Sequence, residues 1–322
     1  MRQLNPSTSS SLPVVFILGP TASGKTSLAS ELLQLCACTL ISVDSTQVYR
    51  GMDIGSAKPS PAELSRAPHE LIDIREPWQT YSAAEFCSDA TALIAAARAG
   101  GKVPVLAGGT MMYYRALEEG LADMPAASAE IRAQIASDAE QRGWASVHAQ
   151  LAAVDPEAAK RIHPNDPQRV QRALEVYLLT GEPISQRQGQ TGSGHIEGRL
   201  LKFGLYPQDR AELHQAIGIR FDSMLEAGLI EEVESLAARE QITQSLPSQR
   251  AVGYRQVWEL LCGQISRQDL ADKGKAATRQ LAKRQLTWMR GMDDLVLTDS
   301  QKNNAPDIAR WIVEAVNPEL LD

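Results

Sequence analysis

One short segment has the residue types and the spacing to bind phosphate: Gly19, Pro20, Thr21, Ala22, Ser23, Gly24, Lys25 and Thr26. It follows the apolar run 14–18 and precedes leucines at helical spacing, so a strand and a helix should flank it. A phosphate-binding loop of the G-x-x-x-x-G-K-[ST] type requires this order. The loop amides and the helix N-terminus would face an anion, with Lys25 adding a charge and Thr26 a hydroxyl for Mg²⁺. The segment predicts a phosphate or diphosphate ligand and leaves open which bond is broken.

A carboxylate, Asp44, ends the next strand-like run, 40–44. Residues at the carboxyl ends of parallel strands face the same crevice, so we expect Asp44 at the sheet edge that carries the phosphate loop. The alternative is that Asp44 only caps the following turn, which is a common use of aspartate. The small-residue turn 108–110, after another strand-like run, should lie at the same edge, where it can approach a ligand.

The composition is that of an ordinary globular protein. The 322 residues are 43% hydrophobic and 22% charged, and their net charge is −7, so nucleic-acid binding would depend on local charge. The four cysteines form no C-x-x-C pair, which argues against zinc and for reduced thiols in the cytoplasm. No apolar run is long enough to cross a membrane. Nothing in the sequence indicates an obligate oligomer, so we expect a monomer.

Strand-like and helix-like patterns lie on both sides of a long stretch that is helical only. Strands are predicted at 14–18, 40–44, 68–74, 103–107 and 200–206. A capping box of Ser82 and Glu85 starts a helix that ends at Gly100. We predict an α/β fold, a P-loop NTPase-like parallel sheet flanked by helices, with an all-helical insertion. The expected divisions are a disordered tail at 1–12, a core at 13–120 and 199–322, and the insertion at 121–198 with a flexible linker at 189–194.

The last third of the chain carries two further signals. A helix capped by Asp209 is predicted from Arg210 to about residue 240, with Arg220 inside its apolar stripe. An arginine at the border of a buried face needs an anionic partner, unless it reaches out to solvent. Between residues 249 and 291 there are nine Lys or Arg and three Asp or Glu, an excess of six positive charges (9 − 3). Such a region is either a solvated face or a surface for a phosphate backbone.

Six blocks of the sequence, taken together and in order, resemble the tRNA dimethylallyltransferases, also called tRNA isopentenyl transferases. The blocks are GPTASGKT (19–26), DSTQVYRGMDIGSAK (44–58), LAGGTMMY (106–113), PNDPQRVQRALE (164–175), RAVGYRQ (250–256) and KRQLTWMR (283–290). They span nearly the whole chain, and the second is far more specific than the phosphate loop, which many kinases share. One departure is Glu70, where relatives often have a second histidine; we attach no functional consequence to it.

The resemblance implies transfer of a dimethylallyl group from dimethylallyl diphosphate to tRNA. The acceptor would be N6 of the adenosine 3′ of the anticodon, position 37, in tRNAs that read codons beginning with U. Asp44 would act as base, and Lys25 and Arg220 would stabilise the leaving diphosphate held by the loop. Mg²⁺ would be the cofactor, with Thr26 as its ligand, and Thr110 would lie near the bridging oxygen.

The resemblance also implies that the helical insertion grips the anticodon stem-loop. The residues expected to contact tRNA come from both core and insertion: Asp44, Ser45, Thr46, Gln47, Thr110, Arg132, Gln168, Arg169, Val170, Gln171, Arg172, Arg250, Ala251, Val252, Gly253, Tyr254, Arg255, Lys283, Arg284, Gln285, Leu286, Thr287, Trp288, Met289 and Arg290. The adenosine would have to leave its stack to reach the pocket, which costs least in an open loop.

Three other functions stay open at this point. A small-molecule kinase uses the same loop but needs ATP and no RNA. A nucleotide-dependent switch or RNA-binding module would lack transfer chemistry, and the N-K-x-D guanine motif of a GTPase is absent from the sequence. An isopentenyltransferase acting on free adenine nucleotide would need neither the insertion nor the basic region.

Overall fold

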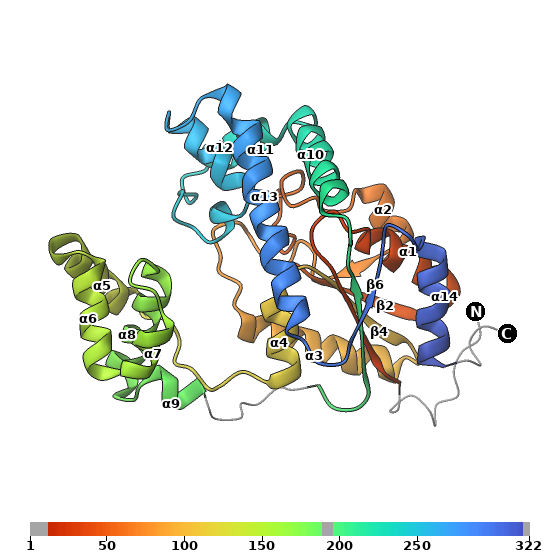
Figure 1. Ribbon diagram of the computed structural model, residues 1–322, viewed down its shortest axis with the longest axis horizontal. Helices are drawn as coiled ribbons and strands as arrows, with labels where there is room; N and C mark the ends of the chain where they lie inside the picture. Colours follow the sequence, from red (N-terminus) through yellow and green to blue (C-terminus); the bar gives the residue numbers. More distant parts are fainter. Residues whose placement is uncertain (1–11, 189–195, 318–322) are drawn as a thin grey trace. The chain divides into compact units, whose positions relative to one another are not determined.

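Within its described residues, the chain folds around a six-stranded sheet in which every neighbouring pair of strands is parallel (Figure 1). A computed structural model describes residues 12–188 and 196–317. The order is β3-β2-β4-β1-β5-β6, with bounds β1 (Val14–Leu18), β2 (Cys38–Val43), β3 (His69–Glu70), β4 (Val103–Gly108), β5 (Leu200–Leu205) and β6 (Leu295–Thr298). Strands covered on both faces are apolar along their whole length, as 14–18 is. The predicted α/β fold with a parallel sheet is confirmed.

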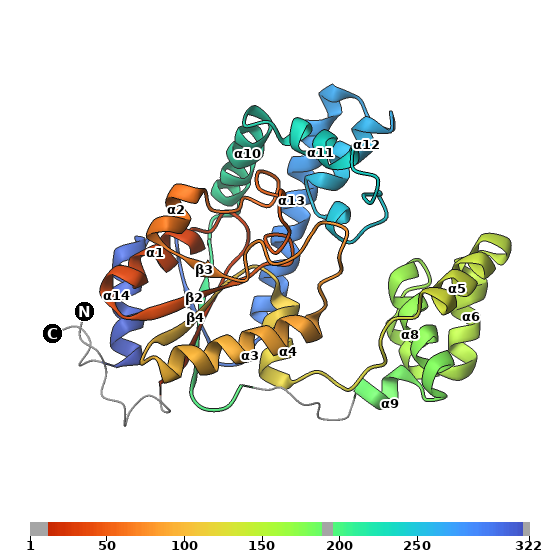
Figure 2. The same cartoon turned by 180° about the vertical axis from the view of Figure 1, so that it is seen from behind.

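Helices cover both faces of this sheet (Figures 1 and 2). Helices α1 (Lys25–Leu35) and α14 (Ala305–Val316) pack on one face, in a core that contains Val15 and Ile17 of β1. On the other face the Phe16 ring lies 4.7 Å from the Tyr114 ring of α4 (Met111–Glu119), centroid to centroid. Helix α3 (Ala83–Ala99) covers the same face. Because side chains alternate along a strand, β1 contributes to both apolar layers.

The sheet order explains why the predicted site segments meet. Strands β2, β4 and β1 are adjacent and parallel, so their carboxyl ends share one edge. Asp44 follows β2, residues 109–110 follow β4, and the phosphate loop follows β1. The amides of Gly109 and Thr110 both donate to the Val43 carbonyl, at 3.2 and 3.1 Å, which joins two of these ends directly.

Residues 116–195 form a second compact unit, which is helical. Its helices are α5 (Ala129–Arg142), α6 (Trp144–Val154), α7 (Pro156–Arg161), α8 (Pro167–Thr180) and α9 (Ile184–Gln188), and they enclose an apolar core of their own. The sequence placed this insertion at 121–198, and its predicted linker at 189–194 lies outside the described residues. The predicted tail 1–12 lies outside them too, except Leu12, which is buried.

Two sequence predictions in the core are wrong in extent. The helix expected from Arg210 to residue 240 is two helices, α10 (Arg210–Glu226) and α11 (Leu229–Ala237). Gly228 between them has φ +100°, a left-handed conformation that ends one helix and starts the next. The strand expected at 68–74 is only β3, because Leu71 and Asp73 have φ of 65° and 56°, which no strand allows.

The remaining helices of the core complete its second half. They are α2 (Pro61–Arg66), α12 (Tyr254–Leu261) and α13 (Arg267–Arg290), with a short 3-10 helix at Ser248–Arg250 before α12. Helix α13 packs against α10 and carries most of the basic region. Within residues 12–188 and 196–317, no helix is both long and apolar enough to cross a membrane.

Candidate active site

The phosphate loop presents free donors toward a cavity. Helix α1 begins at Lys25, and its N-cap, Gly24, has φ 88° and no side chain to cap the first amides. The Ser23 hydroxyl is buried, lines the cavity and has no hydrogen-bond partner within the described chain. Uncapped helix amides and an unpartnered hydroxyl together are what an anion would satisfy.

Lys25 turns back onto its own loop. Its Nζ donates to the carbonyls of Gly19 and Pro20, at 2.9 and 2.7 Å. Burial, and after it the nearby Arg220 guanidinium, lower the pKa of Lys25 from its usual 10.5 to about 7, while Asp44 opposes the shift. The ammonium therefore lacks enough negative charge around it in the protein alone, which is the condition of a group prepared for an anionic ligand.

The cavity has a volume of about 340 Å³ and lies entirely within the α/β unit. Seven consecutive residues of the loop and helix, 21–27, form one wall, and Asp44, Gly109 and Arg220 contribute from other elements. Arg220 is half-buried and has no hydrogen bond or ion pair with any described residue. Burial lowers its pKa, while Asp44 raises it. Arg220 therefore does not simply reach out to solvent, and two cations converge on one cavity.

Asp44 both caps the turn after β2 and lines the cavity, which the sequence analysis treated as alternatives. Its Oδ1 accepts hydrogen bonds from the Thr46 amide at 2.8 Å, the Thr46 hydroxyl at 2.5 Å and the Gln47 amide at 3.3 Å. It thus caps the turn after β2. It also lines the cavity with Thr46 and Gln47, and its Oδ2 has no hydrogen bond within the described chain. One oxygen holds the turn, and the other remains free for chemistry.

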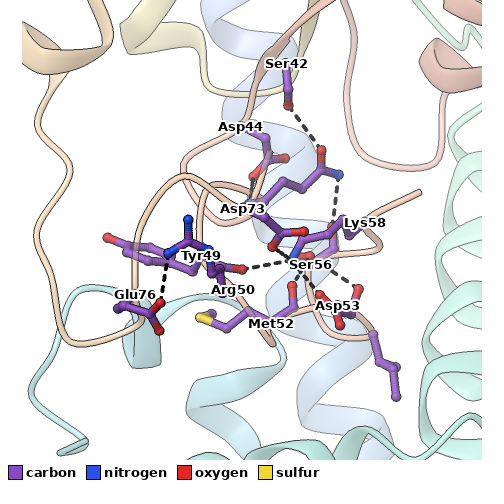
Figure 3. Close-up of polar contacts among 12 residues, drawn as sticks. Ser42, Asp44, Tyr49, Arg50, Met52, Asp53, Ser56, Lys58, Asp73 and Glu76 are labelled. Atoms are coloured by element: carbon purple, nitrogen blue, oxygen red, sulfur yellow. Dashed lines mark hydrogen bonds and ion pairs between the residues drawn. The ribbon is translucent and has the colours of Figure 1, made fainter. Parts of the chain in front are cut away.

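A network that sequence reasoning missed fixes the loop after Asp44 (Figure 3). The buried Lys58 ammonium donates to Asp53 and Asp73, both at 2.5 Å, and to the Tyr49 carbonyl at 2.8 Å. Ser42 donates to Gln47 Oε1 at 3.1 Å, which orients a residue of the cavity wall. The available signal was Asp53 near Lys58 in one polar loop. The second carboxylate on Lys58 comes from Asp73, which lies outside that loop and could not be paired with Lys58 from sequence.

Glu232 of α11 holds the same loop from outside. Its carboxylate accepts from three consecutive amides, those of Asp53, Ile54 and Gly55, at 2.8 to 3.1 Å. It also accepts from the Tyr254 hydroxyl at 2.6 Å. Nothing in the local sequence predicts this role, because the three amides lie about 180 residues away from Glu232. Gly55 and the two residues after it line the cavity, so Glu232 fixes part of the cavity wall.

Gln285 connects α13 with two of the loops. Its Oε1 accepts from the Thr21 amide at 3.0 Å, and its Nε2 donates to the Gly109 carbonyl at 2.8 Å. Thr110 lies beside this contact, and its hydroxyl accepts from the Ser45 amide at 3.1 Å. Thr110 does not itself line the cavity, whereas Gln285 does.

The basic block of α13 has two distinct faces. The side chains of Gln285, Leu286 and Met289 are buried, so Leu286 and Met289 do not lie on the surface where RNA contacts were expected. Its exposed members are Lys283, Arg284, Thr287, Trp288 and Arg290. The Trp288 ring is 39% exposed and lies 5.8 Å from the Arg115 guanidinium, which gives this face one aromatic surface among its cations.

The segment 250–255 divides in a similar way. Arg250 and Arg255 are exposed, while Tyr254 is fully buried with its hydroxyl on Glu232. Val252 and Gly253 line the cavity, and Ala251 is half-buried. The buried tyrosine supports the segment, and the two arginines are the side chains that it presents to solvent.

In the helical unit, several residues that were expected to contact RNA instead pair with other residues of the same unit. The fully buried Glu175 pairs with Arg132 at 2.8 and 3.1 Å and with Arg172 at 2.7 Å. A buried carboxylate requires such partners. Val170 is fully buried, so its side chain is not on the surface. Gln168 and Arg169 are exposed, and Gln171 donates to the Arg132 carbonyl at 3.0 Å.

The residues present fit a magnesium ion only if the ligand supplies oxygens as well. No group of three His, Cys, Asp or Glu in the described ranges could hold a metal. Thr26 is exposed in the first turn of α1, beside the cavity, and its hydroxyl has no hydrogen-bond partner there. Mg²⁺ is commonly held by few protein oxygens together with substrate phosphates and water. A site made from Thr26 and diphosphate oxygens therefore fits this geometry.

Fold and site define an α/β protein with a phosphate-binding loop and an anion pocket at the carboxyl edge of its sheet. Residues 47–292 match the family described as IPP transferase. The chain is 55% identical over 299 residues to the tRNA dimethylallyltransferase of Thioalkalivibrio sulfidiphilus, covering 92% of this chain and 93% of that one. The chain belongs to the IPP transferase family.

Solved structures agree with this assignment. The full-length tRNA isopentenylpyrophosphate transferase from Bacillus halodurans is 35% identical with a TM-score of 0.69, and the match covers 95% of this chain and 97% of that one. A eukaryotic dimethylallyltransferase acting on tRNA is 27% identical with a TM-score of 0.75, covering 96% and 78% of the two chains. The P-loop-like α/β fold expected from the sequence is confirmed by these neighbours.

Proposed function

We infer that this chain transfers a dimethylallyl group from dimethylallyl diphosphate to tRNA. Two relatives that match this chain over nearly their whole length are named tRNA dimethylallyltransferases. The observation that carries the inference is one cavity in which uncapped loop amides, Lys25 and Arg220 lie beside Asp44. This arrangement offers an anion site and a carboxylate base at the same sheet edge, as a transfer from a diphosphate needs.

The acceptor in this proposal is N6 of the adenosine 3′ of the anticodon, position 37, in tRNAs that read codons beginning with U. An exocyclic adenine amine is a weak nucleophile because its lone pair is delocalised into the ring. The lone pair of N6 forms a bond to C1 of the donor while the C1–O bond breaks. The electron pair of that bond leaves with the diphosphate, and the N6 proton passes to the free oxygen of Asp44.

Charge develops on the diphosphate as it leaves, and the chain offers groups to stabilise it. The amides at the start of α1, the Lys25 ammonium and the Arg220 guanidinium all reach the cavity. Lys25 would exchange its bonds to the two loop carbonyls for the diphosphate, and the anion would raise its pKa again. Mg²⁺ held by Thr26 and the diphosphate would neutralise part of the charge on the leaving group.

The exposed cations at 250, 255, 283, 284 and 290 support the same proposal, since a free nucleotide would not need them. They would contact phosphates of the anticodon stem-loop, which positions the RNA without reading its sequence. From the helical unit, Gln168 and Arg169 would add contacts. Thr46 and Gln47, which line the cavity, would face the flipped base together with Ser45.

The proposal is tested by incubating the purified protein with Mg²⁺, dimethylallyl diphosphate and unmodified tRNA. The nucleosides of the digested anticodon loop are then weighed by mass spectrometry. We expect a gain of one dimethylallyl group on the adenosine after the anticodon. If no tRNA gains mass while diphosphate still binds, the protein is not this transferase, and consumption of ATP with small-molecule acceptors would be measured next.

A further inference from the structure

The cavity has an apolar end that the phosphate chemistry does not use. Ile217, Phe221 and Met224 line it from α10, and Leu281 lines it from α13. Ile217 and Met224 lie three and four positions from Arg220, and Phe221 lies four and three positions from the same two residues, so this side of α10 joins the guanidinium to the aromatic ring along the cavity wall. An apolar wall therefore begins directly beside the cation expected to hold the diphosphate.

A glycine on α13 makes room for one of these side chains. A Cβ atom at Gly274 would lie 1.9 Å from Cζ of Phe221 and 2.4 and 2.5 Å from its two Cε atoms. Such contacts are impossible, so the tip of the ring occupies the space that a side chain at 274 would fill. Phe221 is only 2% exposed and Gly274 is buried. If the ring were pushed out of this notch, it would move into the adjoining cavity, because Phe221 already lines that space.

We propose that Phe221, seated by Gly274, limits the donor to a five-carbon chain. This inference rests on the proposed function. The carbons of an allylic diphosphate begin one bond from the diphosphate, so they must lie beside Arg220 and continue along the apolar face of α10. Phe221 is the largest side chain on that face. A ten-carbon chain, longer by one isoprene unit, would meet the ring where the five-carbon chain ends.

The variant Phe221→Leu tests the proposal without emptying the core. Steady-state rates are measured with dimethylallyl and geranyl diphosphate at saturating tRNA. We expect the ratio of kcat/KM for the ten-carbon donor to that for the five-carbon donor to rise about tenfold or more, because a hydrophobic pocket discriminates by one methylene at that level. Ile219→Ala is the matched control: Ile219 is 60% exposed on the same helix and does not line the cavity. It should leave the ratio unchanged.

The variant Gly274→Ala tests the notch from the other side. The added methyl should push the ring into the cavity and raise KM for the five-carbon donor. Because Phe221 supplies all three nearest atoms, the double variant Gly274→Ala/Phe221→Leu should recover the donor preference of Phe221→Leu alone. A methyl group that only disturbed helix packing would not be rescued in this way.

Two results would overturn the inference. If the ratio between donors stays at the wild-type value in Phe221→Leu while KM for tRNA rises, the apolar end holds the adenine. If neither changes, Phe221 and Gly274 only pack the core. Both results need a wild-type protein that modifies tRNA, so they are distinct from a failure of the proposed function, in which the wild-type protein makes no product with either donor.

Discussion

Asp44 is the residue on which the proposed chemistry depends most directly. Asp44→Asn keeps an oxygen that can accept from the Thr46 and Gln47 amides, so the turn should persist. The substitution removes the base. We predict that kcat falls by about 10²–10⁴-fold, the usual contribution of a general base, while donor affinity changes little. Single-turnover rates and donor binding measured on the same preparation check this, and unchanged turnover would exclude Asp44 as the base.

If Lys25 holds the diphosphate as proposed, donor binding should depend on pH. Its pKa of about 7 in the free protein should rise when a diphosphate binds, since an opposite charge favours the ammonium. Between the two pKa values, binding must then take up a proton. Affinity is therefore greatest below about pH 7 and weakens as the pH rises above it. At pH 8 nearly one proton should be taken up per donor bound.

Calorimetry in buffers of different ionisation enthalpy measures this uptake. In the variant Lys25→Met the uptake should disappear together with most of the affinity. Donor binding at pH 8 with no proton uptake by the wild-type protein would contradict the assignment of Lys25 to the diphosphate.

At the scale of elements, Gln285 makes α13 part of the site. Gln285→Leu leaves the Thr21 amide and the Gly109 carbonyl without their partner, and each unpaired buried group costs about 1–3 kcal/mol. We predict a lower free energy of unfolding and weaker donor binding. Gln280→Leu on the same helix is the control, because Gln280 is exposed and should change neither. Denaturant unfolding and donor titration distinguish the two variants, and equal effects would contradict this role.

The exposed face of α13 should carry part of the tRNA affinity. Replacing Lys283 and Arg284 by alanine should weaken binding and reduce the dependence of log K on log salt by about 0.7–0.9 per lost phosphate contact. The pair Arg267→Ala/Lys273→Ala removes two exposed cations from the other half of the helix, outside the block that resembles the family. If both pairs reduce the slope equally, the effect is one of general charge, and the predicted surface is wrong.

Element bounds followed from the sequence where local chemistry decides them. The capping box at Ser82 and the stop at Gly100 give α3 its observed bounds. Where the local signal is ambiguous, the prediction failed. A glycine within a helical pattern can either end the helix or be tolerated inside it, and Gly228 separates α10 from α11 where one long helix was predicted. Strand β6 was missed, since its short run pairs only with β5 at the sheet edge.

At the scale of the molecule, the site could be placed from sequence because parallel strands deliver their carboxyl ends to one edge. The phosphate loop and Asp44 therefore line one cavity, as this reasoning predicts. Arg220 lies within α10 and not at a strand end, and only the resemblance to a family pointed to its place in the same cavity. What sequence could not give are the contacts between distant residues. Glu232 on the 53–55 amides, Gln285 on Thr21 and the Glu175 network depend on tertiary packing. Tertiary packing also decides which residues are buried and which are exposed within the blocks 164–175, 250–256 and 283–290.

The central claim is that the loop holds a leaving diphosphate, whereas in a kinase the same loop holds a phosphoryl group in transfer. The most direct measurement uses dimethylallyl diphosphate labelled with ¹⁸O at the oxygen that bridges C1 and phosphorus. Because C1–O cleavage is proposed, we predict that all of the label appears in inorganic diphosphate, in an amount equal to the modified adenosine. Label found in dimethylallyl alcohol, or retained in dimethylallyl monophosphate while the acceptor is phosphorylated, would show that a P–O bond breaks instead, and would contradict the account.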